Sequence, residues 1–105
     1  MWNEPSREQL DAIPRLYESE AVPLENKLIH LHFFIGGCDW YVAEFDGKDS
    51  LFGFAILNQD NQNAEWGYFS LSELKSLSVG WVEVDCETPW EVLPAYAIPE
   101  IRRAS

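Results

Sequence analysis

Two histidines stand two positions apart in a strand-like segment, and their spacing is the first that could support chemistry. Alternate side chains of a strand point to one face, so His30 and His32 would lie side by side. Two imidazoles at this spacing can bind zinc or nickel, with Cys38 or Glu44 as a third ligand. No Cys-x-x-Cys or His-Glu-x-x-His motif accompanies them, and a half-exposed polar sheet face explains them better. We therefore predict no metal and no cofactor.

The acidic residues do not form a pattern typical of catalysis. Glu83, Asp85 and Glu87 alternate onto one face of a predicted strand. Paired carboxylates support acid–base catalysis when burial separates their pKa values, and the sequence predicts no cleft there. They are better explained as a charged face exposed to solvent, or as charges that prevent another strand from pairing with the edge of the sheet. Asp46 and Asp49 share a turn that lacks the ligand series of a calcium loop. With no nucleophile motif or phosphate-binding loop, we predict that the chain is not an enzyme.

Aromatic residues give a stronger indication of binding. Trp40 is predicted on one sheet face together with His30, His32, Val42 and Glu44, and this face receives only the small residues Gly53 and Ala55 from the next strand. Bordered by Trp66 or Tyr68, this face would form a shallow aromatic groove, and exposed aromatic patches mark interaction sites. The alternative is that the aromatic residues of the proline-rich tail fill the groove. The candidate interaction surface comprises Trp40, Glu44, Asp46, Asp49, Trp66, Tyr68, Glu83, Asp85 and Glu87.

A small sheet has to position these side chains. Alternating hydrophobic residues predict strands over residues 28–35, 39–46, 51–57, 64–69 and 81–86. Short turns separate the first four, so consecutive strands should pair in antiparallel fashion. Short helices are predicted after Ser6, ending near Ala12, and after Ser70, because each serine stands three residues before a Gln or Glu. The predicted fold class is α+β: an antiparallel four- to five-stranded meander sheet with short helices packed on one face.

The length of 105 residues suits a single domain, residues 1–105. We divide it into an N-terminal helix and wrapping loop (1–27), the sheet with its inserted helix (28–86), and a proline-rich C-terminal strap (87–105). The wrapping loop should pack on the core through Leu16, Tyr17, Val22 and Leu24. The inserted helix should pack on the core through Leu71, Leu74 and Leu77, and Gly80 is predicted near its end.

Five sequence blocks occur in an order that resembles a known family. They are LYESEAVPLENK at 16–27, HFF at 32–34, WYVAEFDG at 40–47, FG at 52–53 and GYFSLSEL at 67–74. Together they are similar to the bacterial domain-of-unknown-function 2958 family. The resemblance implies a stand-alone bacterial domain, often encoded on plasmids, phages and other mobile elements. It implies no assigned activity and no catalytic residues.

The net charge restricts the class of partner. The chain carries 18 acidic against 7 basic residues, for a formal net charge of −11. Binding of duplex nucleic acid or of an anionic membrane requires clustered Lys and Arg, so neither partner is expected. Positions 39–100 hold twelve acids against two lysines, and a field of this kind favours encounter with a basic protein.

We therefore expect a non-enzymatic acidic protein-binding domain of a bacterial mobile element. One concrete form is an inhibitor of a host nucleic-acid-binding defence enzyme that mimics phosphate charge. One alternative is a small-ligand-binding or hydrolytic domain that uses the aromatic groove. Another is an accessory docking subunit. The N-terminus lacks the features of a signal peptide and only Cys38 and Cys86 are present, which predicts a cytoplasmic protein.

Overall fold

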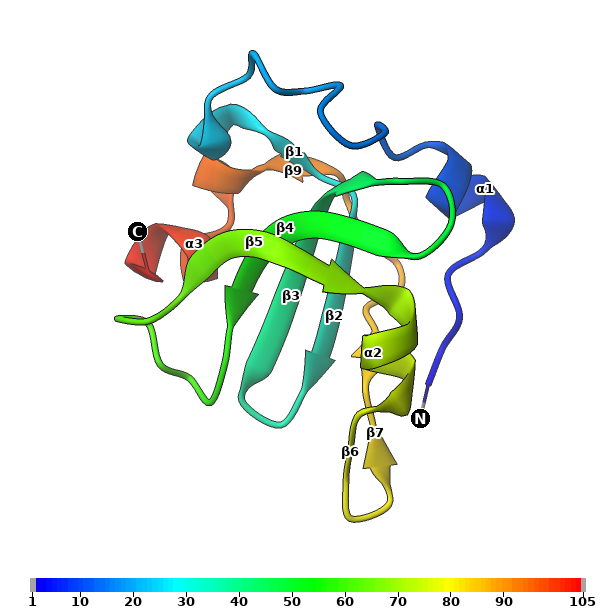
Figure 1. Cartoon of the computed structure of the whole chain (residues 1–105). Coiled ribbons are helices and arrows are strands. Elements are labelled where there is room, and N and C mark those ends of the chain that lie inside the picture. The colour runs from blue at the N-terminus through cyan, green and yellow to red at the C-terminus, as the bar shows by residue number, and fades with distance from the viewer. Residues whose placement is uncertain (1, 105) are drawn as a thin grey trace.

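The computed structural model describes residues 2–104 and is built around one antiparallel sheet of five strands in the order β5-β4-β3-β2-β8 (Figure 1). The strands are β2 (Leu31–Ile35), β3 (Cys38–Phe45), β4 (Ser50–Ile56), β5 (Glu65–Ser70) and β8 (Asp85–Cys86). Consecutive pairing from β2 to β5 confirms the α+β class and the antiparallel meander. Every helix within residues 2–104 is too short or too polar to cross a membrane.

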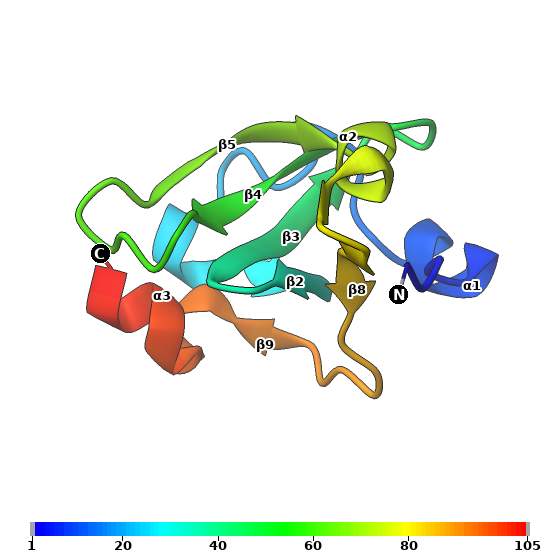
Figure 2. The ribbon, with the colours of Figure 1, turned by 90° about the horizontal axis from the view of Figure 1, so that it is seen from below.

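The remaining elements are short, and helices among them cover both faces of this sheet. They are α1 (Arg7–Asp11), η1 (Leu24–Asn26), α2 (Leu71–Ser76), η2 (Ala95–Ala97) and α3 (Pro99–Ala104), with the strand pairs β1 (Leu28–Ile29) with β9 (Leu93–Pro94), and β6 (Ser78–Val79) with β7 (Val82–Glu83). Residues of α1 and α2 pack on one face, which we call the α2 face. Residues of η2 and α3 pack on the other, which we call the tail face (Figure 2).

A two-residue turn at Gly36-Gly37 sets the register of the sheet. Because Ile35 pairs with Cys38, Phe33 lies opposite Trp40 and His32 lies opposite Tyr41. Paired residues point to the same face, so Trp40 lies on the α2 face and His32 on the tail face. The predicted grouping of Trp40 with His32 on one face is therefore wrong, because a shift of one residue moves a side chain to the opposite face.

A β-bulge between Val42 and Glu44 changes the faces a second time within β3. The extra residue sends Phe45 to the α2 face together with Val42, whereas Glu44 lies opposite Phe52 and faces the other way. The predicted alternation, with Val42 and Glu44 on one face, is wrong for this reason. The bulge also explains Gly53: a Cβ there would lie 1.9 Å from the backbone oxygen of Tyr41.

Both predicted helices are confirmed at their first residues. Ser6 and Gln9 form a complete capping box at α1, and the Ser70 side chain accepts a hydrogen bond from the backbone N–H of Glu73 at α2. The prediction for Leu77 is wrong: α2 ends at Ser76, Leu77 is extended, and its side chain is 45% exposed. Gly80 does take the left-handed conformation, but it does so in the turn between β6 and β7.

Three other segments differ from their predictions. The strand predicted over residues 81–86 divides into β7, which belongs to a separate hairpin, and β8, which pairs with β2. The predicted strand 28–35 is interrupted at His30, so that Ile29 packs on the tail face. The tail is not only an extended strap, because its last residues form α3 and bury Ile101. A strand prediction from alternation alone cannot detect such interruptions.

Candidate functional site

Hairpin β6–β7 projects from the body of the molecule beyond α2 (Figure 1). Its two-residue turn contains Gly80, whose φ of +64° suits glycine, followed by Trp81. The Trp81 side chain is 95% exposed, and the neighbouring Val79 and Val82 are exposed as well. The tip of the hairpin therefore offers a large aromatic side chain to solvent.

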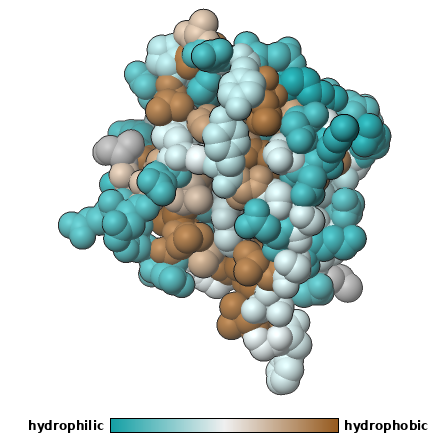
Figure 3. Space-filling view, in the orientation of Figure 1, coloured by the Kyte–Doolittle hydropathy of each residue, from teal (hydrophilic) through white to brown (hydrophobic). Residues whose placement is uncertain are grey.

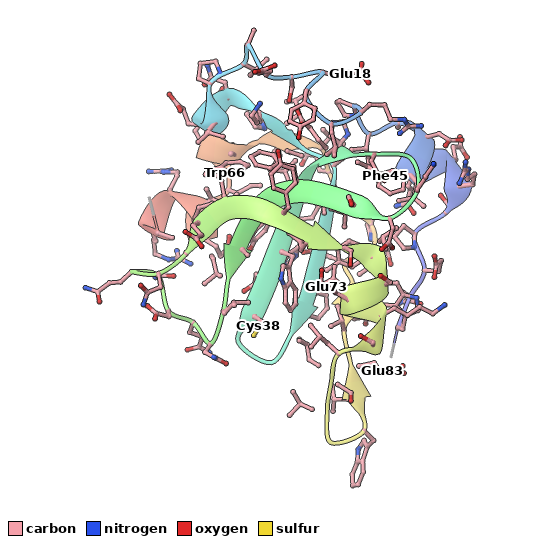
Figure 4. All side chains as sticks on the ribbon, in the orientation of Figure 1. Glu18, Cys38, Phe45, Trp66, Glu73 and Glu83 are labelled. Carbon is pink, nitrogen blue, oxygen red and sulfur yellow. The ribbon has the colours of Figure 1, made fainter. Side chains whose placement is uncertain are left out.

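An apolar groove of about 340 Å³ opens beside the base of this hairpin on the α2 face. Ile35, Trp40 and Leu74 are buried side chains of its lining, whereas Leu57 and Leu77 are exposed. Figure 3 shows apolar surface at the base of the hairpin. Figure 4 shows Cys38 and Glu73 beside the groove and Glu83 on the hairpin below them. We call hairpin β6–β7 and this groove together the hairpin surface.

A second cluster surrounds the buried carboxylate of Glu44. It accepts hydrogen bonds from the backbone N–H of Tyr17 at 2.9 Å, from the backbone N–H of Ser19 at 3.1 Å, and from the Ser19 hydroxyl. The Lys27 ammonium lies 3.9 Å away and is buried too. Burial alone would raise the pKa of Glu44, but these hydrogen bonds and the Lys27 charge outweigh it and hold the pKa below its usual range.

This cluster corrects the prediction for the wrapping loop. Leu16 is half-buried, but Tyr17, Val22 and Leu24 do not pack into the core, since they are 63%, 38% and 42% exposed. The loop is instead held to the sheet by hydrogen bonds between its backbone and Glu44. A carboxylate that binds several donors can replace apolar packing as the attachment of a loop.

A third cluster holds His32 between two carboxylates. Its Nδ1 lies 2.6 Å from Glu87 and its Nε2 lies 2.7 Å from Asp39, while its ring stacks on Tyr41 with centroids 4.4 Å apart. Burial lowers the pKa of His32, but the two carboxylates outweigh it and raise the pKa above its usual value. Both ring nitrogens are engaged, so this imidazole attaches the start of the tail to the sheet and has no free lone pair for catalysis.

The histidine pair does not form the metal site considered from its spacing. Both nitrogens of His32 face carboxylates, and Cys38 packs against the core of the α2 face. Burial lowers the pKa of His30, whose Nε2 is buried without a hydrogen-bond partner. Among residues 2–104, no group of three or more His, Cys, Asp and Glu side chains is arranged to hold a metal ion.

The aromatic groove predicted between Trp40 and Trp66 does not form. Trp40 is buried on the α2 face, and Trp66 lies on the tail face beside Phe54. The tail does cover its own face: Trp90 packs there and donates a hydrogen bond to the Ile29 carbonyl. Tyr96 is 56% exposed and does not fill a groove.

The predicted acidic surface residues do not form one patch. Asp46 accepts three backbone N–H bonds in the turn before β4, and Asp49 accepts two hydrogen bonds from Ser72 at the start of α2. Asp85 accepts a hydrogen bond from Asn3. Glu44 is buried and Glu87 is bound to His32, whereas Glu83 and Tyr68 are exposed members of the predicted surface.

For two exposed aromatic residues, Trp81 and Tyr17, the sequence patterns predict a different environment from the one in the structure. The alternation over residues 81–86 predicts that Trp81 belongs to a regular strand, although the Val-Gly-Trp-Val sequence at 79–82 is also compatible with a two-residue turn. Tyr17 is predicted to pack on the core, but its exposure depends on a buried carboxylate 27 residues further along the chain. Sequence periodicity does not report such long-range contacts.

Comparison with known proteins gives one match. The model of the family described as "Protein of unknown function (DUF2958)" matches residues 6–91, which is most of the chain. No curated protein and no solved structure matches it. The matched range contains the whole sheet, the Glu44 cluster and hairpin β6–β7. The chain therefore belongs to the DUF2958 family.

Proposed function

We propose that this chain is a non-enzymatic protein-binding domain that contacts a basic partner protein through the hairpin surface. The observation that carries the proposal is Trp81, which is 95% exposed at the tip of a projecting hairpin. Tryptophan is the residue most enriched among binding hot spots, because its burial removes a large apolar area from water. The adjacent groove would accept an apolar side chain of the partner.

Charge complementarity determines the class of partner. The net charge of −11 repels a second copy of the same chain and attracts a basic surface. Glu73 lines the groove and Glu83 lies on β7, so carboxylates flank the apolar contact area. This arrangement, with apolar residues at the centre and charges at the rim, is typical of protein–protein interfaces. The rim charges would increase the association rate, and Trp81 would slow dissociation.

The finer form of the proposal is a cytoplasmic protein of a bacterial mobile element that inhibits a host defence enzyme. The excess of acids in residues 39–100 would occupy the basic nucleic-acid channel of that enzyme by mimicry of phosphate charge. An accessory docking subunit would use the same surface without blocking a channel. The absence of a catalytic role is supported by His32 and Glu44, whose polar atoms are engaged in structural bonds.

The test compares the proteins captured by three immobilised forms of the chain from a bacterial lysate. The forms are the wild type, Trp81→Ser, and the control Tyr96→Ser, which removes a different exposed aromatic residue. We expect a basic protein that is retained by the wild type and by Tyr96→Ser, lost with Trp81→Ser, and released by increasing salt. The same protein captured equally by all three forms, or binding that salt does not weaken, would refute the proposal.

If a partner is captured, its activity on nucleic acid distinguishes the two finer forms. A nuclease or helicase whose activity falls on addition of the wild-type chain, but not of Trp81→Ser, supports inhibition. A partner whose activity is unchanged supports docking alone and overturns charge mimicry.

A further inference from the structure

The geometry points to a second binding site, for a monovalent organic cation, on the tail face of the sheet. The site is a cavity of about 200 Å³ between the loop that contains Tyr17 and the outer part of β4 and β5. Tyr17, Phe52 and Tyr68 supply its aromatic walls, and we call these three residues the aromatic cage. The cage lies on the opposite face of the sheet from the apolar groove, so the inference does not depend on the proposed function.

The rings of Phe52 and Tyr68 form a corner of the cavity rather than a stacked pair. The rings of Phe52 and Tyr68 have centroids 5.1 Å apart and are inclined by 56°. Trp66 stacks behind Phe52 at 5.8 Å and supports it. The side chains of Tyr17 and Tyr68 share a hydrogen bond that raises the pKa of Tyr68, yet they remain 63% and 59% exposed. Aromatic rings that face a shared cavity, and not each other alone, can accept a cation over their faces.

The backbone at Tyr17 shows that the position of this wall is enforced. Tyr17 has a φ of +71°, in the left-handed region that bulky residues rarely occupy. The buried Glu44 carboxylate holds this conformation by accepting the backbone N–H groups of Tyr17 and Ser19. A strained residue held by the surrounding structure is often found where a ligand is bound, and a wall fixed in advance lowers the entropy cost of binding.

The charges around the cavity favour a cation over an anion. Glu20 lines the cavity and is exposed, so its carboxylate is available to a ligand. The positive charge of Lys27, which also lines the cavity, is compensated, because its ammonium donates to the backbone and hydroxyl oxygens of Ser19 and lies 3.9 Å from Glu44. With Glu44 and Lys27 balancing each other, Glu20 and the electron-rich ring faces determine the sign of the ligand.

Two sources could supply such a cation: a free quaternary ammonium compound, or a lysine or arginine side chain of another protein. Both present a positively charged organic group that can bind over aromatic faces. The probes are therefore choline, its neutral isostere 3,3-dimethylbutanol, and the N-acetyl amides of lysine, trimethyllysine and arginine. Each is titrated into the ¹⁵N-labelled chain and followed by NMR.

We expect saturable shifts of the Tyr17, Phe52 and Tyr68 amide signals with the cations, with dissociation constants on the order of 1 mM. The neutral isostere should bind at least about fivefold more weakly, since it lacks the cation–π attraction. Tighter binding of choline than of the amino-acid amides identifies a small molecule as the ligand. The reverse order identifies a protein side chain.

Three substitutions separate the cage from unspecific binding of cations to an acidic protein. Tyr68→Ala should weaken choline binding by about two- to thirtyfold, whereas Tyr68→Phe should retain most of it, because the ring face remains. Tyr96→Ala, at a tyrosine of similar exposure elsewhere, should change nothing. Equal affinity for choline and its neutral isostere, equal losses with Tyr68→Ala and Tyr96→Ala, or no saturable shifts up to about 50 mM would overturn the inference.

Discussion

Replacing Glu44 by glutamine tests whether a buried carboxylate fixes the wrapping loop to the sheet. The substitution preserves the size of the side chain but removes its charge and one of its two acceptor oxygens. In the wild type, those oxygens accept the N–H groups of Tyr17 and Ser19 and face the ammonium of Lys27. The variant therefore leaves Lys27, which is 6% exposed, without its counter-charge.

The expected loss of stability is large for a single polar substitution. Breaking a buried ion pair by removing one partner costs about 3–5 kcal/mol, because the remaining charge is left uncompensated. The amide of the variant can still accept one hydrogen bond, and Lys27 keeps its bonds to Ser19, which places the loss near about 3 kcal/mol. For a domain of this size, that corresponds to a fall in Tm of about 12–24 °C.

Urea unfolding of the wild type, Glu44→Gln and the control Glu20→Gln measures the effect. Glu20 belongs to the same loop but is exposed, so its substitution should change the free energy of unfolding by less than about 0.5 kcal/mol. Because the folded pKa of Glu44 is below 4.5, its contribution is present above pH 4.5 and is lost as the pH falls through the folded pKa. The difference between wild type and Glu44→Gln should shrink accordingly. A loss below about 1 kcal/mol, or a difference that does not change with acidification, would refute the reasoning.

Three further predictions concern other parts of the sheet. Because the pKa of His32 is raised, its stabilising contribution is complete below pH 6.5 and is lost as the pH rises through the folded pKa. His32→Asn should therefore destabilise the fold most at acidic pH, as measured by thermal unfolding between about pH 5.5 and 8.5. Gly53→Ala should lower the free energy of unfolding in urea by about 3 kcal/mol or more, because the new Cβ would meet backbone atoms. Gly67→Ala, at the paired position with open space, should change it by less than about 1 kcal/mol. Equal effects of the two substitutions would contradict the bulge geometry. Burial, with help from neighbouring carboxylates, raises the pKa of the Cys86 thiol to about 11, so a thiol reagent at about pH 8 should label only Cys38 until the chain unfolds.

The features that could be predicted from the sequence depend on neighbouring residues. The caps at Ser6 and Ser70 each involve a side chain and a backbone group three residues away, so the sequence contains the whole interaction. The strands β2 to β5 and their antiparallel order follow from alternation and from turns of a few residues. The family was predicted from a resemblance of five sequence blocks, and the match over residues 6–91 confirms it.

The face assignments failed although the sequence contained the relevant signal. A two-residue loop at Gly36-Gly37 requires Ile35 to pair with Cys38, which places Trp40 with Phe33 and not with His32. The register follows from the length of the turn, and the alternation of each strand taken separately cannot supply it. The bulge at Ala43 is different, because no turn residue or glycine in β3 marks it, and only Gly53 in the partner strand reflects it.

The candidate sites could not be predicted, because both depend on contacts between distant segments. The aromatic cage exists since Glu44 holds the backbone of Tyr17, and these residues are 27 positions apart. The hairpin surface exists because α2 stops at Ser76 and the following residues form a separate hairpin rather than joining the sheet directly. In both cases a polar or irregular segment, not a periodic one, decides which side chains are exposed.

The acidity of the chain has two physical roles, and only one of them concerns a partner. Asp39 and Glu87 share the imidazole of His32, and Glu44 is balanced by Lys27, so these carboxylates act within the fold and their fields partly cancel. The exposed acids that are not bound in this way include Glu65, Glu73, Glu83 and Glu91. Two of these four flank the hairpin surface. The net charge therefore overstates the field that a partner meets, and the position of Glu73 and Glu83 at the hairpin surface is a stronger reason to expect a basic partner there than the total of −11.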